Sequence, residues 1–187
     1  LKAVHWKKNQ LEKFAHDLAI FMNTFQQIDT TGGPLPSAQN FYRGGSLLNY
    51  DGETRKAISL LAGNIDHNAA LELWGKAINT KYTGHSVWVH GDISLGNLLV
   101  ADGNLSAVID FGQLAVGDPA CDLTIAWTML HGKSRELFIQ SILVDQGTWI
   151  RAQAWGLWKA LIIAAGISEA NNSEKQNSFR IIREILG

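Results

Sequence analysis

The sequence has few of the features that mark secreted, membrane or nucleic-acid-binding proteins. Its single cysteine, Cys121, cannot form an internal disulfide, so we expect a small buried side chain there and a reducing, cytoplasmic setting. Acidic and basic residues nearly cancel to a net charge of −1, so no basic excess indicates nucleic acid and no charged run indicates a membrane surface. The most apolar stretch, residues 157–167, includes Lys159 and is too short to cross a bilayer. The 187 residues suffice for one domain or one large lobe with its own core.

Three polar residues, by contrast, stand at the ends of short apolar runs in the middle of the chain. Asn97 follows Asp92 by five residues, and Asp110 follows Asn97 by thirteen. The apolar runs, bounded by turn residues, indicate strands at residues 87–89, 98–100 and 105–109. Between the last two, Asp102-Gly103 tolerates the positive φ of a tight hairpin turn. Folding this hairpin back brings Asn97 and Asp110 together, with Asp92 near them.

These residue types suit phosphoryl transfer. The transferred group needs a base for the acceptor hydroxyl and oxygen ligands that hold Mg²⁺ against the phosphates. Mg²⁺ prefers hard oxygen donors and uses few protein ligands. We therefore expect Asp92 to be the catalytic base and Asn97 and Asp110 to be the metal ligands.

The pattern His-x-Asp, four residues, Asn, with a later strand-borne Asp-Phe-Gly, resembles the catalytic loop of protein kinases. With Gly91 in place of the kinase arginine, it looks like the aminoglycoside phosphotransferase family of small-molecule kinases. Residues 116–123 (VGDPACDL) and 41–45 (FYRGG) are similar to that family as well. The likeness covers essentially the whole chain, but only the C-terminal lobe of such enzymes. It implies a single kinase-like lobe over residues 1–187, mostly helical with one small β-hairpin.

In the family that the chain resembles, an N-terminal β-rich lobe clamps the nucleotide. The sequence contains no Gly-x-Gly-x-x-Gly loop, no Walker A sequence and no early strand pattern with a phosphate-binding lysine. It also begins with Leu1 and not Met, so we expect a truncated or processed chain that lacks this lobe and is inactive alone. A further departure is Ser94-Leu95, where relatives have His-Pro. Ser94 stands near the expected phosphate position and can donate a hydrogen bond, but it carries no charge.

Other residues of these motifs have supporting roles in this interpretation. We expect His90 to bond the backbone near Asp110, and Asp118 to cap a helix. Asp122 lies among apolar residues, so it is expected to be buried and to accept hydrogen bonds from backbone amides of the catalytic loop. Arg43 is a candidate for contacting a phosphate or an anionic substrate group, and pairing with a surface carboxylate is an equal alternative.

Helical periodicity and capping residues predict helices on both sides of the strands. The helix from Thr148 is apolar on nearly all sides, which is typical of a helix buried at the centre of a lobe. A long loop is expected from about residue 30 to residue 49. The predicted helices cover residues 9–28, 52–63, 67–80, 119–131, 134–144, 148–165 and from 173 onward. The tryptophans at helical spacing, Trp127, Trp149, Trp155 and Trp158, are assigned to the core, and the alternative for one or two of them is the lining of an acceptor pocket.

The leading hypothesis is an ATP-dependent kinase that phosphorylates a hydroxyl of an aminoglycoside-like antibiotic, a sugar or another alcohol; the sequence leaves GTP open as the donor. A polycationic acceptor would need an acidic pocket, whose candidates are scattered in the sequence: Asp29, Asp51, Glu53, Asp145 and Glu169. The alternative is a non-catalytic binding or regulatory module with a degenerate kinase lobe. A metal-dependent phosphoesterase ranks last, because the sequence lacks the Asp-x-His and the later strand-end histidines of a dimetal site.

Overall fold

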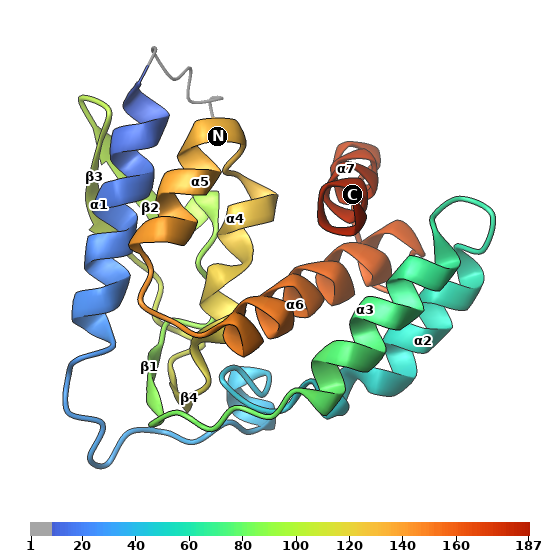
Figure 1. Cartoon of the computed structure of the whole chain (residues 1–187), viewed down its shortest axis with the longest axis horizontal. Coiled ribbons are helices and arrows are strands. Elements are labelled where there is room, and N and C mark those ends of the chain that lie inside the picture. The colour runs from blue at the N-terminus through green and yellow to red at the C-terminus, as the bar shows by residue number, and fades with distance from the viewer. Residues whose placement is uncertain (1–8) are drawn as a thin grey trace. The chain divides into compact units, whose positions relative to one another are not determined.

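The computed structural model describes residues 9–187, which divide into two compact units. Unit 1 comprises the described residues through Gly45 together with Gly84–Asp145, and unit 2 comprises Ser46–Thr83 and Gln146–Gly187. The predicted fold class, mostly helical with one small β-hairpin (α+β), is confirmed, and the structure adds a second antiparallel strand pair (Figure 1). The division into two units does not test the assignment of residues 1–187 to one lobe, which stays a prediction. Among residues 9–187 there is no helix with the length and hydropathy of a membrane span.

Unit 1 is built around a helix pair and two small sheets. Helix α1 packs against α5 and β3, and its buried face comes from Phe14, Leu18 and Met22, one turn apart (Figure 1). The elements of unit 1 are α1 (Gln10–Phe25), β1 (Val87–Val89), β2 (Leu98–Ala101), β3 (Asn104–Val108), β4 (Ala115–Gly117), α4 (Ile125–Thr128) and α5 (Gly132–Ser141), with 3-10 helices η1 (Ala38–Asn40), η3 (Leu95–Asn97) and η4 (Pro119–Thr124).

The strands form two antiparallel pairs. Strands β2 and β3 form the predicted hairpin, and its turn residues Asp102 and Gly103 have φ values of 51° and 79°. Both turn residues are therefore left-handed, as the Asp-Gly sequence led us to expect. Strand β1 pairs with β4, which the sequence analysis did not predict. The second pairing brings the segment after Asp110 back beside the strand that leads to Asp92.

The prediction of one α-helix over residues 119–131 is wrong. Residues 119–124 form the 3-10 helix η4, and only the four residues of α4 are α-helical. The side chain of Arg135 supplies the reason for the early end. Its Nε donates to the carbonyl oxygen of Ala126 at 2.7 Å, and its Nη2 donates to that of Leu130 at 3.1 Å. The bond to Ala126 replaces the one that a longer helix would form with the N–H of Leu130, which instead donates to the carbonyl oxygen of Ile125 at 3.1 Å.

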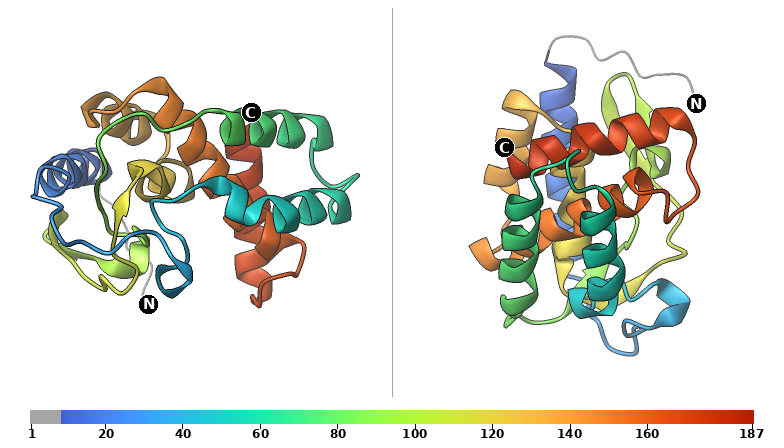
Figure 2. Two further views of the ribbon diagram at one scale, coloured as in Figure 1. Left: turned by 90° about the horizontal axis from the view of Figure 1, so that it is seen from below. Right: turned by 90° about the vertical axis from the view of Figure 1, so that its right-hand side faces the viewer.

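Unit 2 consists of helices around the long apolar helix. Helix α6 packs against α2, α3 and α7, so the prediction of a central buried helix is confirmed (Figure 2). Trp155 and Trp158 of α6 are buried, as is Trp127 in unit 1, whereas Trp149 is partly exposed. The elements are η2 (Leu47–Tyr50), α2 (Asp51–Leu60), α3 (His67–Asn79), α6 (Gln146–Ala164) and α7 (Asn172–Leu186). Apart from residues 119–131, the ends of the predicted helices differ from these by three residues or fewer.

Candidate functional site

Asp92 and Asn97 are in direct contact in the loop after β1. The Nδ2 atom of Asn97 donates to the carboxylate Oδ2 of Asp92 at 3.0 Å and to the main-chain oxygen of Asp92 at 2.9 Å. Both side chains are half-buried. Because both bonds use the amide nitrogen, the amide oxygen of Asn97 remains available to a ligand. Asp92 and Asn97, which the sequence predicted as neighbours, are therefore brought together.

Asp110 follows a residue whose backbone is held on both sides. The N–H of Ile109 donates to the main-chain oxygen of Asn97 at 2.9 Å, and its carbonyl accepts from Nε2 of His90, also at 2.9 Å. Asp110 itself has a φ of 63°, and its exposed carboxylate accepts only a long bond of 3.4 Å from the N–H of Gly112. The backbone is thus fixed immediately before Asp110, while the carboxylate stays accessible.

The two ring nitrogens of His90 have different partners, which assigns the tautomer. The carbonyl of Ile109 can only accept, so Nε2 carries the proton. Nδ1 accepts from the N–H of Asp92 at 3.2 Å. His90 is fully buried, and in its neutral form it connects the backbone of Asp92 with that of Ile109.

The carboxylate of Asp122 holds the loop from its buried side. Its two oxygens accept the N–H groups of His90 at 2.6 Å and Gly91 at 2.7 Å, and the residue is 2% exposed. These are the backbone amides that the sequence suggested as its partners. Burial raises the pKa of Asp122, and the hydrogen bonds from His90 and Gly91 oppose that rise. Asp118 caps η4 by accepting from the N–H of Ala120 at 3.1 Å.

Gly91 has no room for the arginine that protein kinases place at this position. Its φ is +83°, and a Cβ atom would lie 2.5 Å from the carbonyl oxygen of Gln113 and 2.9 Å from Cγ of Arg43. A side chain here would be strained by the backbone conformation and blocked by another segment. Glycine is therefore a requirement of this loop.

Arg43 and Ser94 were candidates for contacting a phosphate or the substrate. The Nε of Arg43 donates to Oε1 of Gln113 at 2.9 Å, a partner that neither alternative for Arg43 foresaw. Ser94 precedes η3, and its main-chain oxygen accepts from the N–H of Asn97, while its hydroxyl makes no capping bond. Gln113 was missed, although its place three residues after Asp110 was a signal that could have found it.

The acidic residues named as candidates for a cationic acceptor are divided between the two units. Asp29 and Asp145 belong to unit 1, and the other three belong to unit 2. Within unit 2, Asp51 accepts the indole N–H of Trp74 at 2.7 Å and Glu53 accepts that of Trp158 at 2.6 Å. These two carboxylates therefore help to orient the aromatic side chains of α3 and α6.

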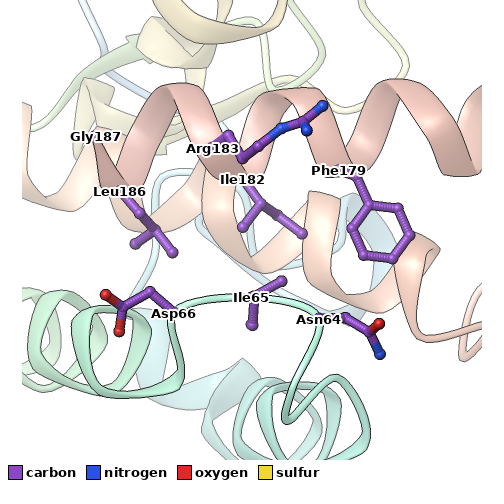
Figure 3. Close-up of a pocket in the computed structure, with 8 residues that line it drawn as sticks. All are labelled: Asn64, Ile65, Asp66, Phe179, Ile182, Arg183, Leu186 and Gly187. Atoms are coloured by element: carbon purple, nitrogen blue, oxygen red, sulfur yellow. The ribbon is translucent and has the colours of Figure 1, made fainter.

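A cavity of about 440 Å³ lies within unit 2, between the loop before α3 and helix α7 (Figure 3). Phe179, Ile182 and Leu186 form its apolar side, and Asp66 and Arg183 stand at its border. None of its lining residues is a predicted site residue.

The side chains of Asn97 and Asp110 have the donor chemistry of a magnesium site. Asn97 offers an amide oxygen and Asp110 an exposed carboxylate, both hard donors of the kind that Mg²⁺ takes. No group of three or more His, Cys, Asp or Glu side chains suited to a metal occurs within residues 9–187. A site of two protein oxygens is nevertheless sufficient where nucleotide phosphates and water complete the coordination.

The chain is mostly helical, and its hairpin places Asn97 and Asp110 beside the Asp92 loop. This is the architecture of a kinase-like phosphotransferase. The chain belongs to the phosphotransferase enzyme family, whose model matches residues 2–161. The expected relation to aminoglycoside phosphotransferases is thereby confirmed. No curated protein matches the chain.

Solved structures share the fold at low sequence identity. The GDP complex of aminoglycoside 2'-phosphotransferase-IIIa is 16% identical with a TM-score of 0.64, and the match covers 97% of this chain and 64% of that one. The streptomycin–ATP complex of APH(2")-IIa is 16% identical with a TM-score of 0.56, covering 97% and 63%. The macrolide 2'-phosphotransferase MphH from Brachybacterium faecium is 19% identical with a TM-score of 0.54, covering 95% and 62%. The chain thus spans less than two thirds of the length of these relatives.

Proposed function

We propose that this chain carries the catalytic part of an enzyme that transfers the γ-phosphoryl group of ATP or GTP to a hydroxyl of a small molecule. The observation that carries the proposal is the bond from the Asn97 nitrogen to the Asp92 carboxylate. It leaves the Asn97 oxygen for a cation and orients a carboxylate beside it. The exposed Asp110, one residue beyond the fixed Ile109, supplies the second oxygen ligand.

In the proposed reaction Asp92 is the general base. Its carboxylate takes the proton of the acceptor hydroxyl as the hydroxyl oxygen bonds to the γ-phosphorus. The bond between that phosphorus and the bridging oxygen breaks, and the nucleoside diphosphate leaves. Asn97 keeps the carboxylate oriented, and His90 and Asp122 hold the backbone on which it stands. When bound, Mg²⁺ supplies positive charge that neutralises the phosphate oxygens in the transition state.

Two exposed apolar side chains favour a nucleotide as the donor. Leu99 of β2 is 47% exposed and Ile109, next to Asp110, is 40% exposed. A purine base buries apolar surface most readily where such side chains stand beside the phosphate-binding groups. We assign Leu99 and Ile109 to contact with the purine ring of the nucleotide. This contact explains why these two hydrophobic side chains are exposed to solvent.

The acceptor is proposed as a class and not as a compound. The solved relatives include complexes with streptomycin, gentamicin and kanamycin and two macrolide phosphotransferases. For this chain we propose a polyhydroxylated small molecule, with aminoglycosides, macrolides, sugars and other alcohols as the panel to be tried.

We also infer that the 187 residues alone turn over little or not at all, because their sequence contains neither a Gly-x-Gly-x-x-Gly loop nor a Walker A sequence that could cover the phosphates. Isothermal titration of the chain with Mg²⁺·ATP tests this inference. Affinity weaker than millimolar is expected, and micromolar binding with clear turnover would contradict it. The catalytic assay is therefore made with this chain and with the longest polypeptide of the same reading frame.

The function is tested by transfer of radiolabel from [γ-³²P]ATP and [γ-³²P]GTP to the acceptor panel. We expect labelled product that falls by about 10²–10⁴-fold in Asp92→Asn. Asp102→Asn, at the exposed turn between β2 and β3, is the matched control and should retain full activity. If the folded long polypeptide labels no acceptor with either nucleotide, and Mn²⁺ does not broaden the amide resonances of Asn97 and Asp110, the proposal is wrong and a non-catalytic module becomes the better description.

A further inference from the structure

A hydrogen bond between Arg43 and Gln113 joins two segments that both border the catalytic loop. Arg43 belongs to the loop after η1, and Gln113 follows Asp110 by three residues. The bond from Nε to Oε1 is 2.9 Å long and is partly buried. It therefore ties the segment after Asp110 to a distant part of the chain.

The same two residues cover the peptide that precedes Asp92. A Cβ on Gly91 would lie 2.9 Å from Cγ of Arg43, 2.9 Å from Cβ of Gln113 and 2.5 Å from the carbonyl oxygen of Gln113. The N–H of Gly91 is meanwhile bound by Asp122 at 2.7 Å. Gly91 is thus held by its N–H and packed at its α-carbon, so that its position depends on both sets of contacts.

The loop that presents Arg43 is itself tightly fixed. The buried side chain of Asn40 donates to the carbonyl oxygens of Leu35 at 3.1 Å and Leu114 at 3.3 Å. Phe41 and Tyr42 both have left-handed φ values, 52° and 50°, which bulky residues adopt only where their surroundings enforce it. The strained backbone directly before Arg43 indicates that the direction of this side chain is built into the fold.

Close backbone contact holds the other end of this loop. The carbonyl of Gly44 accepts from the N–H of Asp118 at 2.8 Å, and a Cβ on Gly117 would collide with that carbonyl. Strand β4 begins two residues after Gln113 and ends at Gly117. The loop therefore lies against both ends of the segment from Gln113 to Asp118.

We propose that Arg43 and Gln113 are positioning residues that fix the Gly91 peptide relative to the Asp110 segment. This inference rests on the proposed function. In that reaction the pair keeps the Asp92 carboxylate and the Asp110 carboxylate at a constant separation. Arg43 acts through Gln113 and Gly91 and does not bind the phosphate itself.

A double-mutant cycle with Arg43→Met, Gln113→Met and the double variant tests the pair. We expect kcat to fall by about 10²-fold in each single variant, because small displacements of reacting groups have effects of this size. The double variant should be no slower than the slower single variant, and the KM for nucleotide should stay unchanged. Gln113→Glu keeps an acceptor for the Arg43 Nε and should retain most of kcat.

Three results would overturn the inference. They are additive effects in the cycle, an increase in KM at constant kcat, and a loss confined to Arg43→Met. The last two would indicate a direct phosphate contact. Arg55→Met is the matched control, since Arg55 forms an exposed ion pair with Asp51 on α2 and should have no effect.

A readout without catalysis separates this inference from the proposed function. Hydrogen exchange of the His90 and Gly91 amides should accelerate equally in both single variants and in the double variant. Unchanged protection would overturn the positioning role even in an active enzyme. Changed protection in a protein that phosphorylates no acceptor would support the pair and count against the proposed function alone.

Discussion

Two substitutions of Asp110 remove the same carboxylate and should differ in stability. Asp110 is exposed, has a φ of 63° and accepts a single long bond of 3.4 Å from Gly112. Little native interaction is lost on removing its side chain, so the backbone conformation decides the free energy of unfolding. Glycine adopts positive φ at no steric cost, whereas alanine does not.

The magnitude follows from two opposing terms. A left-handed backbone costs an ordinary L-residue roughly 1–2 kcal/mol. Glycine instead gives the unfolded chain more freedom, which costs about 0.4–1 kcal/mol. Asp110→Gly should therefore be more stable than Asp110→Ala by about 1 kcal/mol, or roughly 2–4 °C in Tm for a chain of this size. Both variants should lose binding of Mn²⁺ in the presence of nucleotide to the same extent.

Urea unfolding followed by circular dichroism measures the first difference, and Mn²⁺ titration measures the second. Asp102 is the control, because it has a φ of 51° at the tip of the same hairpin. Asp102→Gly and Asp102→Ala should reproduce the order of stability and leave metal binding intact. If Asp110→Gly is less stable than Asp110→Ala, the backbone conformation does not decide the stability at this position. If either variant still binds Mn²⁺, the Asp110 carboxylate is not a metal ligand.

Three further substitutions test the loop around Asp92. Gly91→Ala should lower the free energy of unfolding by about 2–4 kcal/mol, since it combines a left-handed φ with the close carbonyl of Gln113; near-wild-type urea unfolding would show that the loop can move. Burial raises the pKa of Asp122 above its ordinary 3.8, so the unfolded chain loses this proton at a lower pH than the folded chain does. The free energy of unfolding should therefore fall as the pH rises from 3.8 to the raised pKa. Asp122→Asn should abolish this pH dependence, which is measured by urea unfolding at a series of pH values. Asn97→Asp replaces a hydrogen bond to the Asp92 carboxylate with repulsion between two carboxylates, so kcat in the radiolabel assay should fall by about 10–100-fold, and an unchanged kcat would count against the Asn97–Asp92 bond as the basis of the function.

The sequence predicted those parts of the fold that depend on local signals. The hairpin turn at Asp102-Gly103 and the all-round apolar helix α6 both follow from short-range chemistry. The contact between Asp92 and Asn97 is also local, because only five residues separate them. The roles of these residues in catalysis remain predictions.

What the sequence did not predict depends on contacts between distant segments. Strand β4 has three residues and pairs with β1 across the whole hairpin, so no periodicity within it could identify it. Helix α4 ends early because Arg135 bonds carbonyls of the preceding segment. Gln113 acquires its role from Arg43, a partner 70 positions away. In each case the deciding group comes from another segment.

The thirteen-residue interval from Asn97 to Asp110 has its physical basis in an irregularity of the hairpin. With a two-residue turn, Ala101 pairs with Asn104 and Val100 with Leu105, but the register shifts so that Leu99 faces Ala107 and Leu98 faces Val108. The shift inserts one additional residue into β3, and Asn97 therefore meets Ile109. Without that residue Asn97 would face Val108, and each side chain beyond the bulge would point to the opposite face. The thirteen-residue spacing therefore depends on both a two-residue turn and a one-residue bulge. Together they place Asp110 immediately after Ile109, whose backbone is hydrogen-bonded to Asn97 and His90.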